Sequence, residues 1–496
     1  MGSVRHTDNL VFDDNYHLKF GPGDPDNPYN YSFSRKCYIT AIAISLVMNA
    51  TFASSAPSGS FQGISDDLNV SVEVIGLVTT LFLLGYCAGP LFWAPLSEFY
   101  GRRNIFCISF TLYFAFGFLC AFTPTFAGLL VGRFLTGTAA SAALTNAPGV
   151  LADIWNPVQR GNAMILFATM TFVGPALGPI VSGFLQLTKT WRWTFYVLIW
   201  MAAPTILLLY TIPETLPAMA LRGKARLLRK TTRREDIKAP VESIDRSLAA
   251  IFRRDLTRPW RLLLDPISFF VAVYYSIVYT LLYMLFSIYP IVFQQKRGWN
   301  AGDGELPLLG VVIGACLGGI ALFIHSTRIQ RGGCDQKKTS HVPEDRLPGA
   351  IVGGIMFVVT IFWFGWTAEY NSEHWAVPTV AGTFLAMSIL LIFVVFINYI
   401  VDTYTAYAAS ALAANTVLRS ACAAASPLFT DYMFNALGVG GAASLIGAVG
   451  VLLMPMPFIF YRYGAAIRSK SKFAVKDEPS RPSVPLDLVL ERGVGG

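Results

Sequence analysis

The residues best suited to chemistry are two arginines that stand inside long apolar runs. Arg133 is followed at helical spacing by Gly137 and Ser141, and Arg419 follows Asn415 by four residues. A guanidinium in apolar surroundings is costly, so both side chains should face a protein interior or water, where they could bind a substrate. The alternative for Arg133 is a place near the end of its run, from which the side chain extends to polar surroundings.

A row of tyrosines is the second candidate for binding. Tyr275, Tyr279 and Tyr283 recur every four residues, which places them on one face of a helix. Their ring faces and hydroxyls would suit flat or cationic organic molecules. Ordinary helix packing gives the same pattern. We predict that the three tyrosines, the two arginines and Asn415 line one substrate cavity.

Signals for enzyme chemistry are absent from the sequence. The five histidines are scattered, and no pair of Cys and His has the spacing of metal ligands. There is neither a phosphate-binding loop nor a nucleophile elbow. We therefore expect no enzyme, no bound metal and no cofactor. Any transport would have to use a gradient or run downhill.

Charges gather after the second apolar run. Glu98 and Arg102 are four residues apart, close enough to pair at a helix end, and Gly101 permits a tight turn. The alternative is a basic anchor that only fixes the topology. We expect a latch between helix ends, formed by Glu98, Gly101, Arg102, Arg103, Asp153 and Arg160.

Small residues and prolines recur in the fifth apolar run. Small residues let another helix approach closely, and prolines remove backbone donors and bend a helix. The segment is therefore a candidate hinge, with a packing seam without motion as the alternative. Its residues are Gly174, Pro175, Gly178, Pro179 and Gly183.

The elements that must position these residues are membrane-spanning helices. Of 496 residues, 54% are hydrophobic and only 14% are charged, whereas soluble proteins carry about 25% charged residues. The apolar runs have the length that crosses a bilayer. Twelve spans are expected: 38–56, 74–96, 105–122, 127–147, 163–185, 193–211, 267–293, 306–325, 350–366, 377–397, 404–428 and 442–460.

Basic residues set the orientation. With both ends of the chain on one side, that side holds 32 of the 38 Lys and Arg residues, which predicts cytoplasmic termini. The basic residues that give the net charge of +8 then lie mostly at the cytoplasmic surface of the membrane, so nucleic acid is not expected as a partner. The basic residues 222–234 should face anionic lipid. Asn69, in Asn69-Val-Ser71, should lie outside the cell and is a candidate for glycosylation.

Several segments together resemble the major facilitator superfamily, and within it the fungal twelve-span drug:proton antiporters. The resemblance extends from about residue 24 to 468. The segments that carry it are 24–32, 94–103, 133–137, 174–183, 213–215, 298–299, 398–402 and 408–420.

This resemblance implies an all-α fold of two six-helix bundles around a cavity that opens to each side in turn. The expected parts are a cytoplasmic tail 1–36, a bundle 37–212, a basic linker 213–265, a bundle 266–461 and a tail 462–496.

The resemblance also implies a monomer that exports drugs, toxins or other secondary metabolites across the plasma membrane in exchange for protons. Polyamine export, or a uniporter or importer on the same fold, remains the alternative, ahead of a non-transporting sensor. Proton exchange rests on the resemblance alone, because the span interiors show no obvious carboxylate or histidine.

Overall fold

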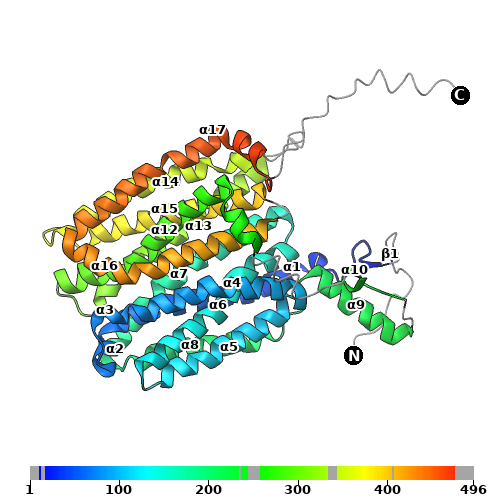
Figure 1. The fold of residues 1–496 in the computed structure, drawn as a ribbon, viewed down its shortest axis with the longest axis horizontal. Helices are drawn as coiled ribbons and strands as arrows, with labels where there is room; N and C mark the ends of the chain where they lie inside the picture. Colours follow the sequence, from blue (N-terminus) through cyan, green and yellow to red (C-terminus); the bar gives the residue numbers. More distant parts are fainter. Residues whose placement is uncertain are drawn as a thin grey trace.

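Long apolar helices lie side by side in this computed structural model (Figure 1). The structure describes residues 11–12, 17–233, 236–243, 257–332, 343–404 and 407–474. Within these residues, eleven helical stretches are long and apolar enough to cross a membrane. Most of the helices extend past the apolar runs that predict them at one end or both, as for Phe126–Ile154 against the run 127–147 and Ala376–Thr403 against the run 377–397.

The first six long helices form one bundle. Asn156 caps α7 through its Oδ1, which accepts a hydrogen bond from the Gln159 amide at 2.8 Å, and Pro157 starts the helix. Short elements η2 (Ala56–Ser60), α2 (Phe61–Leu68) and α3 (Val72–Ile75) join α1 to α4. The long helices are α1 (Phe33–Ser55), α4 (Leu77–Tyr100), α5 (Arg102–Phe122), α6 (Phe126–Ile154), α7 (Pro157–Thr188) and α8 (Arg192–Leu209).

The remaining long helices form the second bundle. The π-helical turn η3 (Pro290–Lys296) extends the first of them, and η4 (Asp303–Glu305) and η5 (Pro343–Arg346) are short 3-10 turns between helices. The long helices are α12 (Pro266–Tyr289), α13 (Leu308–Gly332), α14 (Pro348–Glu369), α15 (Ala376–Thr403), α16 (Ala408–Leu453) and α17 (Pro455–Lys470).

Helices α16 and α17 together make the last two crossings, because they form one continuous stretch, Ser410–Lys470. The 46 residues of α16 alone would reach about 70 Å if straight, more than twice the hydrocarbon thickness of about 30 Å. Gly438 breaks α16 with φ 70° and ψ 171°, in the left-handed region that favours glycine. The chain reverses its direction there (Figure 1). The eleven stretches thus give the twelve crossings that the sequence predicts.

The two bundles repeat one packing pattern. In the first, α4 and α5 pack on α6, and α1 packs on α7. In the second, α13 and α14 pack on α15, and α12 packs on α16. The bundles meet where α4 packs on α16 and α7 on α13. The predicted all-α fold of two six-helix bundles is confirmed.

Helices α4 and α6 approach each other backbone to backbone. A Cβ atom added at Gly89 would lie 1.8 Å from Ser141 Oγ, and one added at Gly137 would lie 2.2 Å from the carbonyl oxygen of Phe82. Neither position has room for a side chain. The Trp93 indole N–H also donates to the Thr138 carbonyl oxygen at 2.7 Å.

The N-terminal residues fold onto the segment between the bundles. Strand β2 (Leu18–Lys19) pairs with β1 (Val11–Phe12), and the Leu18 amide donates to the Lys238 carbonyl oxygen at 2.9 Å. A small apolar core joins β2 to α9 (Pro217–Thr232) and the residues before α10 (Pro240–Ser243). Figure 1 shows this unit beyond one end of the bundles. We call that end the linker end, and the end with α2, α3 and η4 the opposite end.

Acidic partners hold several basic residues of this unit. Lys224 Nζ lies 2.7 Å from Asp24 Oδ2. Arg229 Nη1 lies 2.8 Å from Glu242 Oε2, and its hydrogen bonds hold the pKa of the Glu242 carboxyl below its ordinary value of 4.5. The basic residues 222–234 were expected to face lipid, but Lys224 and Arg229 are paired with acidic residues of the protein. Residue 234 lies outside the described residues.

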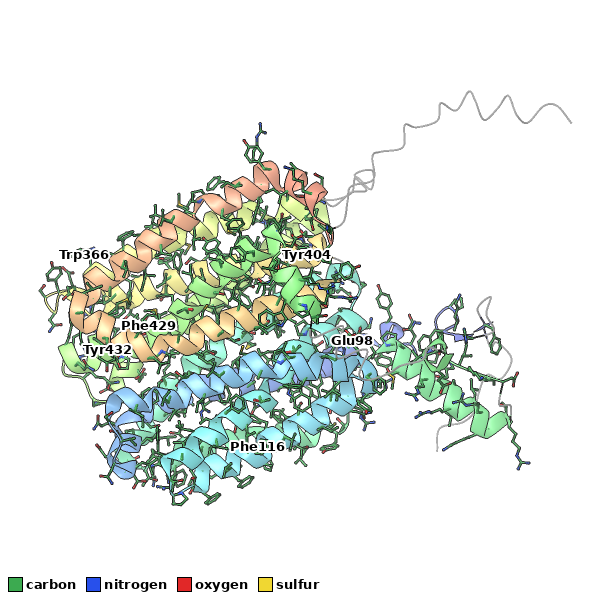
Figure 2. The ribbon with its side chains drawn as sticks, in the orientation of Figure 1. Glu98, Phe116, Trp366, Tyr404, Phe429 and Tyr432 are labelled. Carbon is green, nitrogen blue, oxygen red and sulfur yellow. The ribbon has the colours of Figure 1, made fainter. Side chains whose placement is uncertain are left out.

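Large aromatic side chains mark the opposite end. Trp366 is 50% exposed and Tyr432 is 65% exposed, and Figure 2 shows both there. Amphipathic rings of this kind gather where a membrane meets water.

Candidate functional site

Arg419 lies on α16 among aromatic rings of the second bundle. Its guanidinium carbon is 4.8 Å from the ring centre of Tyr279, 5.0 Å from that of Phe393 and 5.9 Å from that of Tyr275. The residue is 7% exposed. Ring faces attract a cation, which favours this arrangement.

The three tyrosines of α12 share the buried face that their spacing predicts. The Tyr275 hydroxyl donates to the Phe393 carbonyl oxygen at 2.6 Å. The Tyr283 hydroxyl donates to Ser54 Oγ on α1 at 2.9 Å and lies 3.5 Å from the Tyr279 hydroxyl. The hydrogen bond to Ser54 therefore links the two bundles near their centre.

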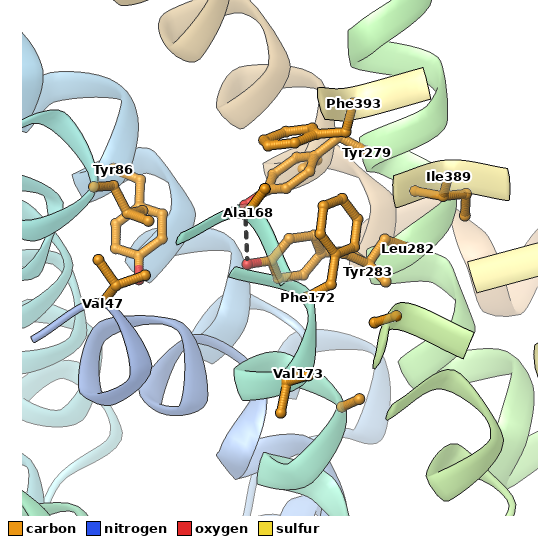
Figure 3. Close-up of a cluster of buried hydrophobic side chains, with 14 of the residues drawn as sticks. Val47, Tyr86, Ala168, Phe172, Val173, Tyr279, Leu282, Tyr283, Ile389 and Phe393 are labelled. Atoms are coloured by element: carbon orange, nitrogen blue, oxygen red, sulfur yellow. Dashed lines mark hydrogen bonds between the residues drawn. The ribbon is translucent and has the colours of Figure 1, made fainter. Parts of the chain in front are cut away.

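Rings of the first bundle complete this cluster. Figure 3 shows Phe172 of α7 beside Tyr279, Tyr283 and Phe393 of the second bundle, with Tyr86 of α4 nearby. The Phe172 and Phe393 rings meet edge to face, with their centres 5.0 Å apart. We call these five rings and Tyr275 the aromatic cluster. Within it the Phe393 ring contacts those of Phe172 and Tyr275, and the Tyr279 ring contacts that of Tyr283.

Asn415 lies one helical turn before Arg419 and is 4% exposed. Its Nδ2 donates to the Ala411 carbonyl oxygen at 2.8 Å, which leaves Oδ1 buried without a partner. Arg419 Nε is likewise buried without an acceptor. Helix α16 thus has an unused hydrogen-bond acceptor, Asn415 Oδ1, and an unused donor, Arg419 Nε, one turn apart.

A cavity of about 60 Å³ separates the bundles toward the linker end. Arg346 and Asp402 at its wall form an ion pair at 2.6 Å. The lining comes from α6, α7, α15, α16 and η5: Pro148, Arg160, Gly161, Met164, Phe167, Ala168, Arg346, Val394, Ile397, Asn398, Val401, Asp402 and Leu412. The cavity reaches the aromatic cluster, because Ala168 borders both (Figure 3).

Arg133 on α6 is fully buried, at 0% exposure. Its guanidinium donates to the carbonyl oxygens of Ala53 at 2.9 Å, Ser54 at 3.2 Å and Val78 at 3.0 Å. The first two belong to the last turn of α1, whose carbonyls lack helical donors and which attracts positive charge. Arg133 therefore joins the end of α1 to α4. It connects to the aromatic cluster through Ser54 and through the Phe82 ring, whose centre lies 4.1 Å from the guanidinium carbon and 4.9 Å from the ring centre of Tyr86.

The charges after α4 hold several helix ends together. Arg102 Nη1 donates to Ser97 Oγ at 2.6 Å and to Asn146 Oδ1 at 3.4 Å, and Arg102 Nε lies 3.5 Å from Asp153 Oδ2. The Arg103 guanidinium donates to the Tyr210 carbonyl oxygen at 3.0 Å. Helices α4, α5, α6 and α8 are therefore connected at the linker end.

Glu214, which follows α8, is a member of this cluster that our sequence reasoning did not assign. Its carboxylate accepts hydrogen bonds from the amides of Arg102 at 2.9 Å and Arg103 at 3.3 Å. An anion at the first turn of α5 is stabilised by the helix dipole. Gly101, at φ 97°, has no room for a side chain, because an added Cβ would lie 2.2 Å from Glu214 Oε2. We call Gly101, Arg102, Arg103, Asp153 and Glu214 the latch.

Glu98 and Arg160 were also expected in the latch. Glu98 lies near it, whereas Arg160 lies at the cavity between the bundles. Figure 2 places Glu98 at the linker end, one turn before Gly101 on α4. Arg160 borders the cavity between the bundles.

The small residues of α7 face α1 and the second bundle. An added Cβ would lie 2.0 Å from Thr51 Oγ1 at Gly174 and 2.7 Å from Ser55 Oγ at Gly178. Pro179 has no N–H for the Pro175 carbonyl oxygen, and the Ser55 hydroxyl supplies the missing donor at 2.6 Å. At Gly183 a Cβ would lie 2.5 Å from the Ala301 carbonyl oxygen of the second bundle. The segment packs closely, and its action as a hinge stays a prediction.

Asn69 is exposed and ends α2 with φ 51°, a left-handed conformation that asparagine tolerates. It lies at the opposite end, and its glycosylation stays a prediction.

Glu305 is a buried carboxyl group that the sequence reasoning missed. It is 0% exposed, and Gln294 Nε2 donates to its Oε1 at 3.1 Å. Its Oε2 is buried without a partner. An added Cβ at Gly183 would lie 3.1 Å from Glu305 Cγ, so the carboxyl borders the contact between the bundles. Within the described ranges, no group of three or more His, Cys, Asp or Glu side chains is placed to hold a metal ion.

Comparisons with known proteins agree with this architecture. The chain matches the Major Facilitator Superfamily over residues 42–427. It is 40% identical to the efflux pump FUB11 of Gibberella moniliformis, over 93% of this chain and 78% of that protein. It is 39% identical to the citrinin biosynthesis cluster MFS transporter mrr1 of Monascus ruber, over 92% of each.

A solved structure of the proton:xylose symporter XylE, bound to 6-bromo-6-deoxy-D-glucose, superposes with a TM-score of 0.62. The alignment covers 87% of this chain and 96% of that chain at 18% identity, which shows the fold alone. The family match and the two fungal relatives each cover most of the sequence. The chain therefore belongs to the Major Facilitator Superfamily and is a membrane transporter, not an enzyme.

Proposed function

We propose that this transporter is a monomer that exports small organic molecules, of the toxin or secondary-metabolite class, across the plasma membrane in exchange for protons. The names of the relatives, an efflux pump and a transporter of a biosynthetic cluster, support export of such compounds. The excess of Lys and Arg supports a cytoplasmic position for the linker end and both termini.

The observation that carries this proposal is the cavity between the bundles. It lies toward the linker end and reaches the aromatic cluster. Toward the opposite end the bundles touch, since Thr80 Oγ1 donates to the Ala424 carbonyl oxygen at 2.8 Å and Gly183 meets Ala301. A substrate would load from the cytoplasm, and release would require these contacts to open, as alternating access demands.

Glu305 is our candidate for the proton-carrying group. Burial of a carboxylate without a counter-ion is costly. Among the described residues, Gln294 is the only hydrogen-bond partner of the Glu305 side chain. Closing the bundles over Glu305 and binding a proton there would therefore favour each other. Opening the opposite end would expose the carboxyl to external water, from which it takes up the proton that favours closing, and the proton must then leave toward the cytoplasm for exchange with substrate.

The test is uptake of labelled toxins and metabolites into inside-out membrane vesicles with an imposed pH gradient. The vesicle lumen corresponds to the outside of the cell, so an acidic lumen should drive uptake. Gradient-independent flux would identify a uniporter, the opposite direction an importer, and the lack of any flux a sensor. Each of these results would overturn the proposal.

Glu305→Gln tests the role of the carboxyl. The amide can keep the hydrogen bond from Gln294 but cannot ionise, so exchange of labelled for unlabelled substrate should persist while the response to the gradient is lost. Glu373→Gln, at an exposed position of the opposite end, is the matched control. A variant Glu305→Gln that responds to the gradient like wild type would exclude Glu305 as the proton carrier.

A further inference from the structure

Arg419 carries a buried charge that the protein leaves without a partner. It forms no hydrogen bond and no ion pair with the described part of the chain, and its Nε is buried without an acceptor. Arg133 is buried to a similar extent but donates to three carbonyl oxygens. An unpaired buried charge is one of the most costly features that a fold can retain.

The groups around Arg419 cannot neutralise it. Its ring contacts come from α12 and α15, with Tyr275, Tyr279 and Phe393, and its own helix contributes Asn415. Ring faces attract a cation but carry no net charge. A counter-ion for Arg419 would therefore have to come from outside the described part of the protein.

The shape and polarity of the surroundings define that anion further. Flat rings on two sides of the guanidinium favour a ligand with an aromatic ring, which can meet Tyr279 and Phe393 edge to face or stacked. A guanidinium offers parallel N–H donors that match the two oxygens of a carboxylate. The unused Asn415 Oδ1, one turn away, can accept a hydrogen bond from a hydroxyl of the same ligand.

The cavity of about 60 Å³ lies on the linker side of this position. The cavity between the bundles is bordered by Ala168, by Val394 next to Phe393, and by Leu412 of the helix that carries Arg419. Arg160 stands at the same cavity and adds positive charge along the way. Arg346 at this wall is paired with Asp402, so Arg160 leaves the lining with one net positive charge that an anion from the linker end would pass on its way toward Arg419.

We propose that Arg419 binds the carboxylate of a planar aromatic acid and that the aromatic cluster holds the ring of this substrate. This inference rests on the proposed export function and names the substrate class of the site. The ring contacts explain how the site tolerates Arg419 before the substrate arrives, and the substrate replaces part of them with an ion pair.

The test uses three probes of one shape and different charge. Naphthoic acid is anionic at neutral pH, its methyl ester is neutral, and naphthylmethylamine is cationic. Binding to the purified transporter is measured by calorimetry, and uptake is measured in inside-out proteoliposomes. Wild type should bind naphthoate about tenfold to a hundredfold more tightly than the ester, because a hydrogen bond to a charged group is worth that factor.

Variants assign the preference to Arg419. Arg419→Gln should remove the difference between acid and ester, whereas Arg419→Lys should keep part of it through its charge. Lys189→Gln, which removes an exposed charge at the opposite end, is the matched control and should behave like wild type. Asn415→Leu should weaken the binding of hydroxynaphthoic acid more than the binding of naphthoic acid, because only the first can donate a hydroxyl hydrogen bond to Asn415.

The outcomes separate this inference from the proposed function. A wild type that binds the ester or the amine as tightly as the acid overturns the inference, whatever the variants do. Preference for the acid that persists in Arg419→Gln also overturns it. Selective binding of the acid without any vesicle uptake would keep the substrate class and overturn export.

Discussion

The first bundle buries Arg133 on α6, and the second buries Arg419 on α16. Arg133 donates to the carbonyl oxygens of two helices, and it supplies the donor that the last-turn carbonyls of α1 lack. Arg419 contacts ring faces and has an unused N–H. Two arginines in similar apolar runs therefore have different tasks. The number of acceptors around each guanidinium separates a residue that holds the frame from one that is free to bind a ligand.

The largest effect is expected at the residue that holds the frame. Arg133→Ala removes a donor from three buried carbonyl oxygens, and the two on the last turn of α1, which lack helical donors, cost about 1–3 kcal/mol each. The variant should lose at least about 2 kcal/mol of stability and all transport, and Arg133→Lys should restore little, because an ammonium cannot span three acceptors. Thermal unfolding of the purified variants is the measurement. A near-normal melting temperature for Arg133→Ala would show that the hydrogen bonds are dispensable.

An intermediate effect is expected at the latch. Glu214→Gln removes the negative charge at the start of α5 and presents an amide N–H to backbone donors, which should cost about 1–2 kcal/mol. The melting temperature should fall, and the transport rate should change for every substrate alike. Glu373→Gln serves again as the control. An effect confined to one class of substrate would contradict a purely mechanical role.

A small effect of opposite sign is expected at Arg419, the arginine that we propose binds the substrate. Arg419→Gln removes a buried charge that has no counter-ion, so stability should stay within about 1 kcal/mol of wild type, on the stabilising side. This separates Arg419 from Arg133 in a single unfolding experiment. Strong destabilisation by Arg419→Gln would make both arginines structural and remove the contrast between them.

The smallest effect is expected at the partly exposed ion pair between Arg229 and Glu242. Hydrogen bonds from Arg229 hold the pKa of Glu242 below 4.5, so this pair stabilises the unit of α9 and β2 above pH 4.5 and is lost as the pH falls through the lowered pKa. A partly exposed pair of this kind is worth about 0.2–1 kcal/mol. Hydrogen exchange of the α9 amides should quicken in that acidic window. Glu242→Gln should exchange quickly at every pH.

The fold could be predicted from the sequence because each crossing of the bilayer requires an apolar helix of a set minimum length. Apolar runs of membrane length predict the crossings, and the break at Gly438 falls between the last two runs. The fold of residues 17–31 onto α9 was not predictable in this way, because only a few apolar contacts and ion pairs support it.

The candidate site could be predicted in part. The spacing of Tyr275, Tyr279 and Tyr283 indicated a shared face, and the structure buries all three, while their contact with a substrate stays a prediction. The sequence could not tell Arg133 from Arg419, because the acceptors of Arg133 exist only where α1 ends in space. Phe393 lies in a uniformly apolar run without any periodic signal.

The close approach of α4 and α6 has a consequence for how this protein can evolve. Because Gly89 and Gly137 have no room for even a methyl group, substitution there disrupts the frame before it can alter selectivity. The rings around Arg419 are held by side-chain contacts, and most of them can be exchanged for rings of other size while the helices stay in place. If the proposed site binds the cargo, we expect new cargo to arise by changes confined to α12 and α15, while the α4 and α6 pair is inherited nearly unaltered.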